Sequence, residues 1–172
     1  MPMPRNAYLA RSMRGELQES IGHLVVTEEE TSGTDAGTFT SGAWRTRDLN
    51  TTEVNTMGAI VGLLPQITLR AGIYEVRASA PAIGVEAHQA RLYDVTNAAV
   101  LLTGTSEMAP SVLSDHGGVT TRSFVLGRIY LTADTAIRLE HRCEKTIVNE
   151  GMGYAIGWTD EIYALLEIHK VA

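Results

Sequence analysis

Cysteine is almost absent from this chain, since Cys143 is the only one among its 172 residues. No intrachain disulfide can therefore form, and a zinc site built from several cysteines is excluded. Long hydrophobic runs are missing as well: the longest, residues 59–64 and 98–102, fall far short of the ~20 apolar residues that cross a bilayer. Residues 1–20 also lack the ~7–15-residue apolar stretch of a secretory signal peptide. We expect a fold held together by its core or by partner chains, without a membrane as partner.

Lysine is scarce too, because 12 of the 14 basic residues are arginine, and 20 acidic residues outnumber them for a net charge of −6. A nucleic-acid partner is not expected, since such binding depends on a basic surface that releases counterions. Arginine suits fixed ion pairs and interfaces better than lysine does. The hydrophobic share of 44% and the charged share of 20% are those of an ordinary globular protein, and the length fits one domain.

Residues 1–21 form a distinct N-terminal arm. Apolar residues recur there at every fourth position, a period that favours a helix. They are Leu9, Met13, Leu17 and Ile21. Gly15 lowers helix stability by ~1 kcal/mol, and an isolated helix of this length is marginal in water, so we expect a helical or extended arm that becomes ordered where it docks. The candidate anchoring residues are Arg5, Tyr8, Leu9, Arg11, Met13, Arg14 and Leu17.

From residue 22 to residue 172 the pattern changes to short segments rich in β-branched and aromatic residues, separated by turn residues. Turn signals at intervals of ~8–12 residues predict an all-β sandwich or barrel. The expected strands cover residues 23–28, 37–40, 44–49, 66–69, 73–80, 88–95, 99–103, 119–126, 128–132, 136–143 and 161–170.

The last expected strand, residues 161–170, is apolar on both faces. Other strands, such as residues 73–80, alternate apolar and polar side chains, which is typical of a strand with one face in water. A strand that is apolar on both faces has one in the core and the other against a partner. We therefore expect a subunit interface there, and its outward side chains would be Tyr163, Leu165, Glu167 and His169.

Two groups of residues could carry catalysis or hold a metal, but each has a simpler explanation. Ser114, Asp115 and His116 are consecutive in a glycine-rich turn, which does not easily allow the geometry of a catalytic triad. His141 and Cys143 lie on one strand face and could supply two metal ligands. Further ligands are missing nearby, which favours a buried thiol beside a satisfied histidine. We expect no catalytic residue, no metal and no cofactor.

Two further segments offer binding chemistry. Residues 28–30 are three consecutive glutamates, but they lack the loop of a known cation site and fit a solvated strand end. Residues 44–47, together with Trp158, offer flat indole and guanidinium faces that could stack on a sugar or base. With aromatics at only 6% a platform of several rings is missing, so core packing of Trp44 is favoured over contact with a host glycan.

An ordered series of motifs resembles a C1q/TNF-like jelly-roll domain, a type that recurs in bacteriophage structural proteins such as tail-fibre tips and capsid decoration or head-fibre proteins. The resemblance covers residues 22–170, and residues 1–21 lie outside it. The motifs that carry it are TEEETSGTDAGTFTSGAWRTRDLNT (27–51), ITLRAGIYEVRASAPA (67–82), HQARLYDVT (88–96), LLTGTSEMA (101–109), TRSFVLGRIYLT (121–132), LEHRCE (139–144) and EIYALLEIHK (161–170).

The resemblance implies a ten-stranded antiparallel sandwich, a homotrimer about a three-fold axis, and no catalytic activity. It leaves two functions open, both of them in a virion assembled in the host cytoplasm. In the first, the protein decorates and stabilises a phage head, and residues 1–21 bind the major capsid protein or another virion protein. In the second, it is a tail-fibre or adhesin tip whose loops, such as residues 105–118 and 145–158, bind a host protein or glycan. The short segment before the jelly roll favours decoration.

Overall fold

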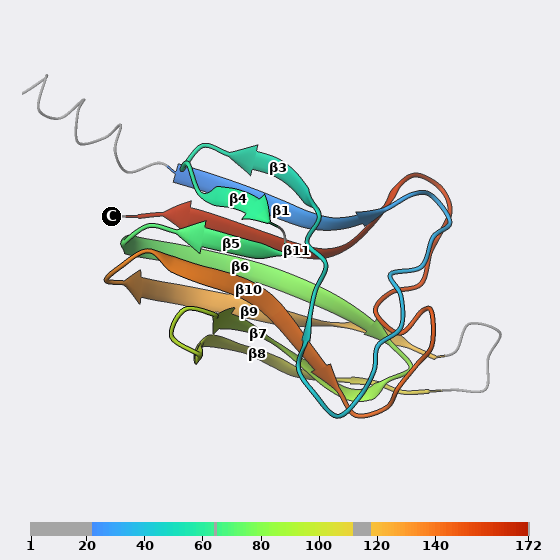
Figure 1. Ribbon diagram of the computed structural model, residues 1–172. Helices are drawn as coiled ribbons and strands as arrows, with labels where there is room; N and C mark the ends of the chain where they lie inside the picture. Colours follow the sequence, from blue (N-terminus) through green and yellow to red (C-terminus); the bar gives the residue numbers. More distant parts are fainter. Residues whose placement is uncertain (1–21, 64, 112–117, 172) are drawn as a thin grey trace, which may run out of the picture.

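The computed structural model describes residues 22–63, 65–111 and 118–171, and all regular structure in them is β-strand (Figure 1). The predicted all-β antiparallel sandwich is confirmed. The strands are β1 (Gly22–Glu30), β2 (Arg45–Thr46), β3 (Thr51–Asn55), β4 (Ile60–Leu63), β5 (Gln66–Leu69), β6 (Gly72–Ile83), β7 (Glu86–Asp94), β8 (Ala99–Ala109), β9 (Thr120–Leu131), β10 (Thr135–Cys143) and β11 (Glu161–Lys170).

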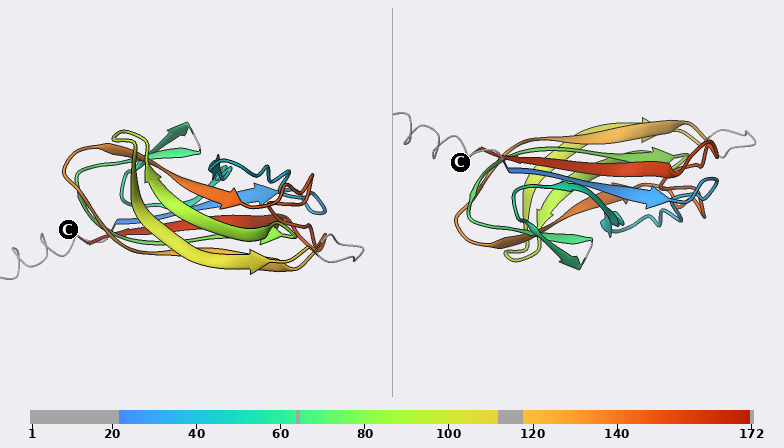
Figure 2. Two further views of the ribbon diagram at one scale, coloured as in Figure 1. Left: turned by 90° about the horizontal axis from the view of Figure 1, so that it is seen from below. Right: turned by 90° about the horizontal axis from the view of Figure 1, so that it is seen from above.

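The strands form two antiparallel sheets. One has five strands in the order β3-β1-β11-β6-β9, and the other has six, in the order β4-β5-β10-β7-β8 with β2 paired to β10. Gly22 at the start of β1 pairs with Lys170 at the end of β11, so the chain enters and leaves the sandwich at the same end. Figures 1 and 2 show that the long loops lie at the opposite end. We call these the terminal end and the loop end.

The core lies between the two sheets and is formed by alternating residues of each strand. On β6 the apolar members of the expected alternation are buried, and so are Ile137 and Leu139 on β10 and Leu166 and Ile168 on β11. Each fully buried side chain of this size contributes ~1.5–3 kcal/mol of hydrophobic stabilisation. A second cluster of buried residues, which includes Phe39 and Cys143, lies under the loops.

A β-bulge in β11 corrects one prediction. Thr27 pairs with Leu165 but Glu29 pairs with Ile162, so β11 has one residue more than β1 over this stretch and the alternation of faces shifts there. Tyr163 is consequently buried, with 5% of its surface exposed, whereas Ile162 is 56% exposed. The outward set on β11 is therefore Ile162, Leu165, Glu167 and His169, and the expectation that Tyr163 faces outward is wrong.

The segment between β1 and β5 also differs from the prediction. Of the expected strands over residues 37–40 and 44–49, the structure keeps a single bridge between Phe39 and Ile147 and the two-residue β2. The strands β3 and β4 were not expected. The strand β3 lies at the edge of its sheet, where its side chains are largely exposed, and most of its residues are polar. The sandwich accordingly has eleven strands in the described residues, against ten expected from the resemblance.

Two expected features lie outside the described residues. They are the anchoring arm of residues 1–21 and the Ser114-Asp115-His116 turn. Within the part of the chain that the structure describes, there is no helix long and apolar enough to cross a membrane.

Candidate functional site

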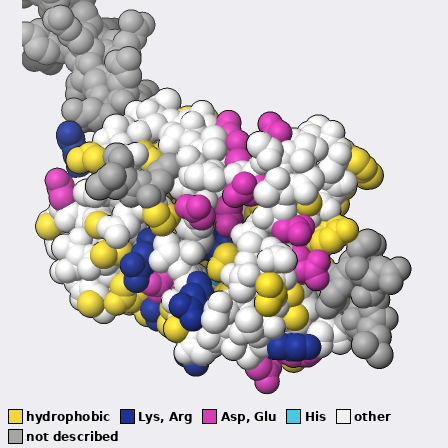
Figure 3. All heavy atoms as spheres, turned by 45° about the vertical axis from the view of Figure 1, so that its right-hand side comes forward, with side chains coloured by type: hydrophobic (Ala, Val, Ile, Leu, Met, Phe, Trp, Pro, Cys, Tyr) yellow, Lys and Arg dark blue, Asp and Glu magenta, His cyan; other side chains and the backbone are white. Residues whose placement is uncertain are grey.

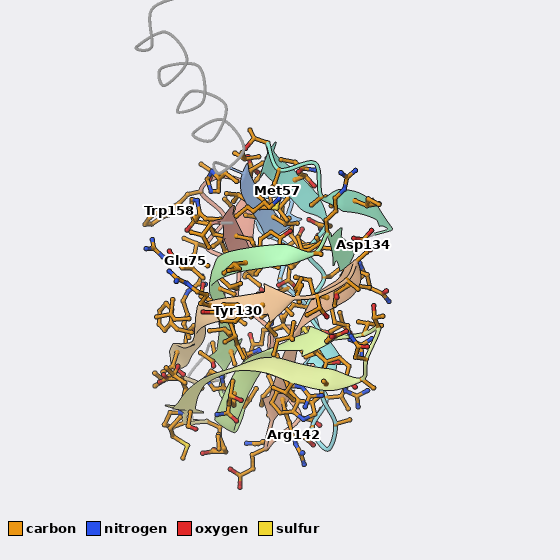
Figure 4. All side chains as sticks on the ribbon, turned by 90° about the vertical axis from the view of Figure 1, so that its left-hand side faces the viewer. Met57, Glu75, Tyr130, Asp134, Arg142 and Trp158 are labelled. Carbon is orange, nitrogen blue, oxygen red and sulfur yellow. The ribbon has the colours of Figure 1, made fainter. Side chains whose placement is uncertain are left out.

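The outer face of the five-stranded sheet carries an unusual number of uncovered apolar side chains. The register places Phe124, Leu126 and Tyr130 of β9 on this face, opposite the outward residues of β6. They are 46%, 64% and 66% exposed. Together with Ile162 and the half-buried Leu165 of β11 they form what we call the apolar face. Figure 4 shows Tyr130 and Glu75 on the neighbouring strands β9 and β6.

Ionic side chains interrupt this face toward the terminal end. Arg128 of β9 donates to Glu75 of β6 at 2.5 Å, and this contact lowers the pKa of the Glu75 carboxyl. Arg77 of β6 stands opposite Leu126 on one side and opposite Glu167 on the other. The face is thus mainly apolar toward the loop end, where Arg122 of β9 donates to the Tyr163 carbonyl oxygen, and mixed toward the terminal end.

Two histidines and one glutamate form a cluster in the mixed part. His23 of β1 pairs with His169 of β11, and Glu167 lies two residues before His169 on the same face. The Nε2 atoms of His23 and His169 donate to the same Glu167 Oε1, at 3.0 and 2.9 Å. The two rings are stacked, with centroids 4.2 Å apart and planes 10° apart. The bond from His169 lowers the pKa of Glu167, and the bond from His23 adds to this.

The outer face of the other sheet carries a cluster of ion pairs on its middle strands. Glu140 of β10 accepts from Arg91 at 2.6 Å and from Arg138 at 2.5 Å. Arg91 lies between two rings, 4.0 Å from the Trp44 ring centroid and 4.6 Å from that of Tyr93. Trp44 therefore packs at the surface against the Arg91 guanidinium. The expectation that it packs in the core is wrong. We call this set the charged face.

A buried ion pair joins the two sheets near the loop end. Arg47 is fully buried and donates from Nε to Glu28 Oε2 at 2.8 Å, and also to the carbonyl oxygens of Pro81 and Met152. Glu28 is 2% exposed, so the expectation of a solvated strand end is wrong for this residue. Buried charges of this kind need every lone pair and proton satisfied, and the two carbonyl groups supply the rest.

The expected pair His141 and Cys143 is buried at the core side of β10. His141 Nε2 is 2.9 Å from His88 Nδ1, and His88 Nε2 is 2.7 Å from Thr121 Oγ1. Burial lowers the pKa of His88 to about 4 and that of His141 well below its ordinary value. His141 Nδ1 has no hydrogen-bond partner among the described residues. Burial also raises the pKa of Cys143 to about 11, so the thiol stays protonated and is a poor ligand or nucleophile.

The loops at the loop end are tied together by Glu161. Its Oε1 accepts from the backbone N–H groups of Gly33, Ile156 and Gly157, and these bonds lower its pKa. Trp158 is nevertheless 87% exposed. A hollow of about 550 Å³ lies nearer the charged face, beside Trp44, His88 and Arg142. Figure 3, with the loop end brought forward, shows acidic side chains beside a smaller group of basic ones.

No protein-family model and no curated protein sequence matches the chain, but solved structures match its fold. The globular domain of zebrafish complement 1qA superposes with a TM-score of 0.54 over 89% of this chain and 97% of that one, at 10% identity. The fold is the C1q/TNF-like jelly roll. The Eiger TNF of S. frugiperda gives 0.53 over 89% of this chain and 94% of that one, at 9% identity. Murine APRIL at pH 5.0 gives 0.51 over 87% and 98%, at 11% identity.

The sequence located only part of the apolar face of this jelly roll. It singled out β11, but Phe124, Leu126 and Tyr130 of β9 were missed. A signal for them exists, because residues 123–127 read Ser-Phe-Val-Leu-Gly and are apolar on both faces in the same way as β11. The sequence placed Glu167 and His169 of the histidine cluster on one outward face, but it carries no signal for His23, which the register of β1 against β11 brings beside them.

Proposed function

We propose that this protein is a non-catalytic structural protein that works as a homotrimer, with the five-stranded sheet turned toward the three-fold axis. The observation that carries the proposal is the contrast between the two outer faces. One exposes Phe124, Leu126, Tyr130 and Ile162. The other has Glu140 paired with Arg91 and Arg138 on its middle strands, and its exposed large apolar side chains, Ile60, Val100 and Met108, lie on the edge strands β4 and β8. Several large exposed apolar side chains on one face are typical of a protein interface. Other copies of the same chain are the proposed partner because the resemblance to C1q/TNF-like jelly rolls implies a homotrimer.

Among the residues that the structure describes, the reactive side chains give no support to catalysis. Cys143 is a protonated buried thiol, and His88 and His141 are neutral and buried among core residues. A nucleophile needs an oriented base within reach, and the cysteine instead lies 3.8 Å from the Phe39 carbonyl oxygen. These groups are better explained as parts of the packing at the loop end.

The finer proposal is that the trimer decorates a bacteriophage capsid, with residues 1–21 as the attachment arm. Support comes from the sequence resemblance to phage structural proteins and from the position of the arm. It joins β1 at the terminal end, so three copies around one axis would present three arms at the same end. Arg5, Arg11 and Arg14 would suit an acidic surface of the major capsid protein.

A tail-fibre or adhesin tip is the second candidate, and one observation favours it. Trp158 and Ile156 are 87% and 64% exposed at the loop end, where a tip would meet its receptor. Exposed tryptophan is enriched at binding hot spots, and its ring also stacks on sugars. In this case the loop end, and not the arm, would bind a host protein or glycan.

Light scattering on the purified full-length protein tests the structural proposal, because a trimer has about three times the 18.6 kDa mass of the chain. A stable monomer would refute it. The finer proposal is tested by mixing the protein with purified heads and with host cells of the same virus. Retention on heads supports decoration, and retention on cells alone supports the adhesin.

A further inference from the structure

We propose that His23, Glu167 and His169 form a binding site for a divalent transition-metal ion, with Zn²⁺ as the ion of choice. The three candidate ligand atoms, His23 Nε2, Glu167 Oε1 and His169 Nε2, all lie within 4.8 Å of one another. They come from two paired strands of one chain. The site is complete in a single subunit, and so it does not depend on the proposed trimer.

The donor set is one that zinc prefers. Two imidazole nitrogens and one carboxylate oxygen are the three protein ligands of several zinc centres, which keep a fourth position for water or another ligand. Imidazole favours zinc, copper, nickel and iron, whereas calcium and magnesium take oxygen ligands. In the single chain the side chains are 30%, 26% and 40% exposed for His23, Glu167 and His169, which leaves a fourth position open to solvent there.

The observed distances are close to those of a loaded site. Zinc bonds of ~2.0–2.2 Å in a tetrahedron separate neighbouring ligand atoms by roughly 3.3 Å, and the two nitrogens already lie 3.0 and 2.9 Å from the oxygen. An outward shift of a few tenths of an ångström brings both nitrogen–oxygen distances to this value, and the two nitrogens, which lie within 4.8 Å of each other, must take up the same separation. Each ring must carry its proton on Nδ1 so that Nε2 can bind the metal, and a tautomer change achieves this without a change in charge.

The neighbouring strand contributes one charge of each sign. Arg77 stands opposite Glu167 and disfavours a cation, whereas Glu75 stands opposite His169 and favours one. Glu75 is itself paired with Arg128. The opposite effects of Arg77 and Glu75 on a bound cation therefore largely cancel, and the affinity for the ion depends on the three ligands.

The test is isothermal titration of untagged, chelator-treated protein with zinc chloride. We expect one Zn²⁺ per chain in the wild type. Glu167→Gln, and His169→Gln and His23→Gln separately, should each weaken binding by at least about tenfold, the smaller loss typical of disturbing a metal site. Glu75→Gln is the matched control, because it removes a carboxylate from the same face, and it should change the affinity by less than about threefold.

Absence of saturable binding to the wild type overturns the proposal, and so does equal binding by the wild type and both histidine variants. A loss in Glu75→Gln as large as that in Glu167→Gln would also overturn it, because the face would then attract cations without a defined site. Circular dichroism and light scattering on each variant verify folding and mass. A monomer that binds zinc would refute the trimer but keep this site, and a trimer that binds none would do the reverse.

Discussion

Leu126→Asp should disrupt the proposed trimer and leave the fold of the subunit intact. Leu126 lies on the outer face of β9 and exposes 64% of its surface in the single chain. A substitution at such a position changes the stability of the subunit by only about 0.5 kcal/mol. In the proposed trimer, by contrast, the same side chain lies in the interface, where an aspartate loses the apolar contacts and has Arg77 of β6 as its opposite residue.

The expected effect on assembly is large. Burial of a whole leucine side chain is worth ~1.5–3 kcal/mol, so covering the exposed part of Leu126 contributes about 1–2 kcal/mol per subunit. The aspartate loses this contribution, and its pairing with Arg77 only offsets the cost of burying the charge. Over three subunits the lost burial amounts to about 3–6 kcal/mol, which is roughly two to four powers of ten in the association constant.

Size-exclusion chromatography with light scattering measures the result at micromolar protein. The variant should elute with the 18.6 kDa mass of one chain and with an unchanged circular dichroism spectrum. Val100→Asp is the matched control, because Val100 is 47% exposed but lies on β8 of the other sheet; it should keep the mass of the wild type. A trimeric Leu126→Asp protein would refute the assignment of the apolar face as the interface.

Three further predictions concern the ion pair, the histidines and the arm. Arg47→Met should reduce the free energy of unfolding in urea by ~3–5 kcal/mol because it leaves the buried Glu28 carboxylate without its partner. The double variant that adds Glu28→Leu should regain most of this stability; an equal loss in the single and the double variant would contradict this. His88 has a folded pKa of about 4, below the unfolded value, so its contribution is complete above pH ~6.5 and falls by ~3 kcal/mol as the pH drops to about 4. Urea unfolding from pH 7 to 4.5 should show a flatter slope in His88→Gln; an identical slope would exclude His88 as the cause. Deletion of residues 1–21 should leave a folded trimer that no longer co-sediments with capsids. Co-sedimentation of the truncated trimer with capsids would refute the role of residues 1–21 as the attachment arm.

Strands with strong periodic patterns could be predicted from the sequence, whereas short ones could not. The expected ranges over 73–80 and 136–143 lie within β6 and β10 because their apolar and polar residues alternate, and the range over 161–170 matches β11 because it contains a continuous apolar run. The strands β3 and β4 escaped prediction because they are short edge strands. The polar residues of β3 carry the composition of a loop, and only pairing with β1 makes them β. The strand β4 is apolar, but its four residues include Gly62 and show no alternation.

The sequence could not place Tyr163 because a bulge is a property of a pair of strands. Simple alternation puts Tyr163 on the same face as Leu165, and the extra residue in β11 reverses this. The inward tyrosine then finds a partner, donating its hydroxyl to the Thr34 carbonyl oxygen at 2.7 Å. Its ring also lies against Gly153, where a Cβ would come within 2.2 Å of it. Contacts with the loops therefore fix the Tyr163 side chain. The alternation of apolar and polar residues predicts strands and carries no information about such loop contacts.

The division of the outer sheet face limits how a second subunit can cover it. Toward the loop end, Phe124, Ile162 and Leu165 need only an apolar surface. Toward the terminal end, Glu75 and Glu167 already have partners within the chain, so their charges can be buried at lower cost than unpaired ones. Arg77 is different, since it is exposed beside Leu126 and makes no ion pair within the described residues. A subunit that covers the row of Leu126 must therefore supply an anion for Arg77 or leave this guanidinium in water.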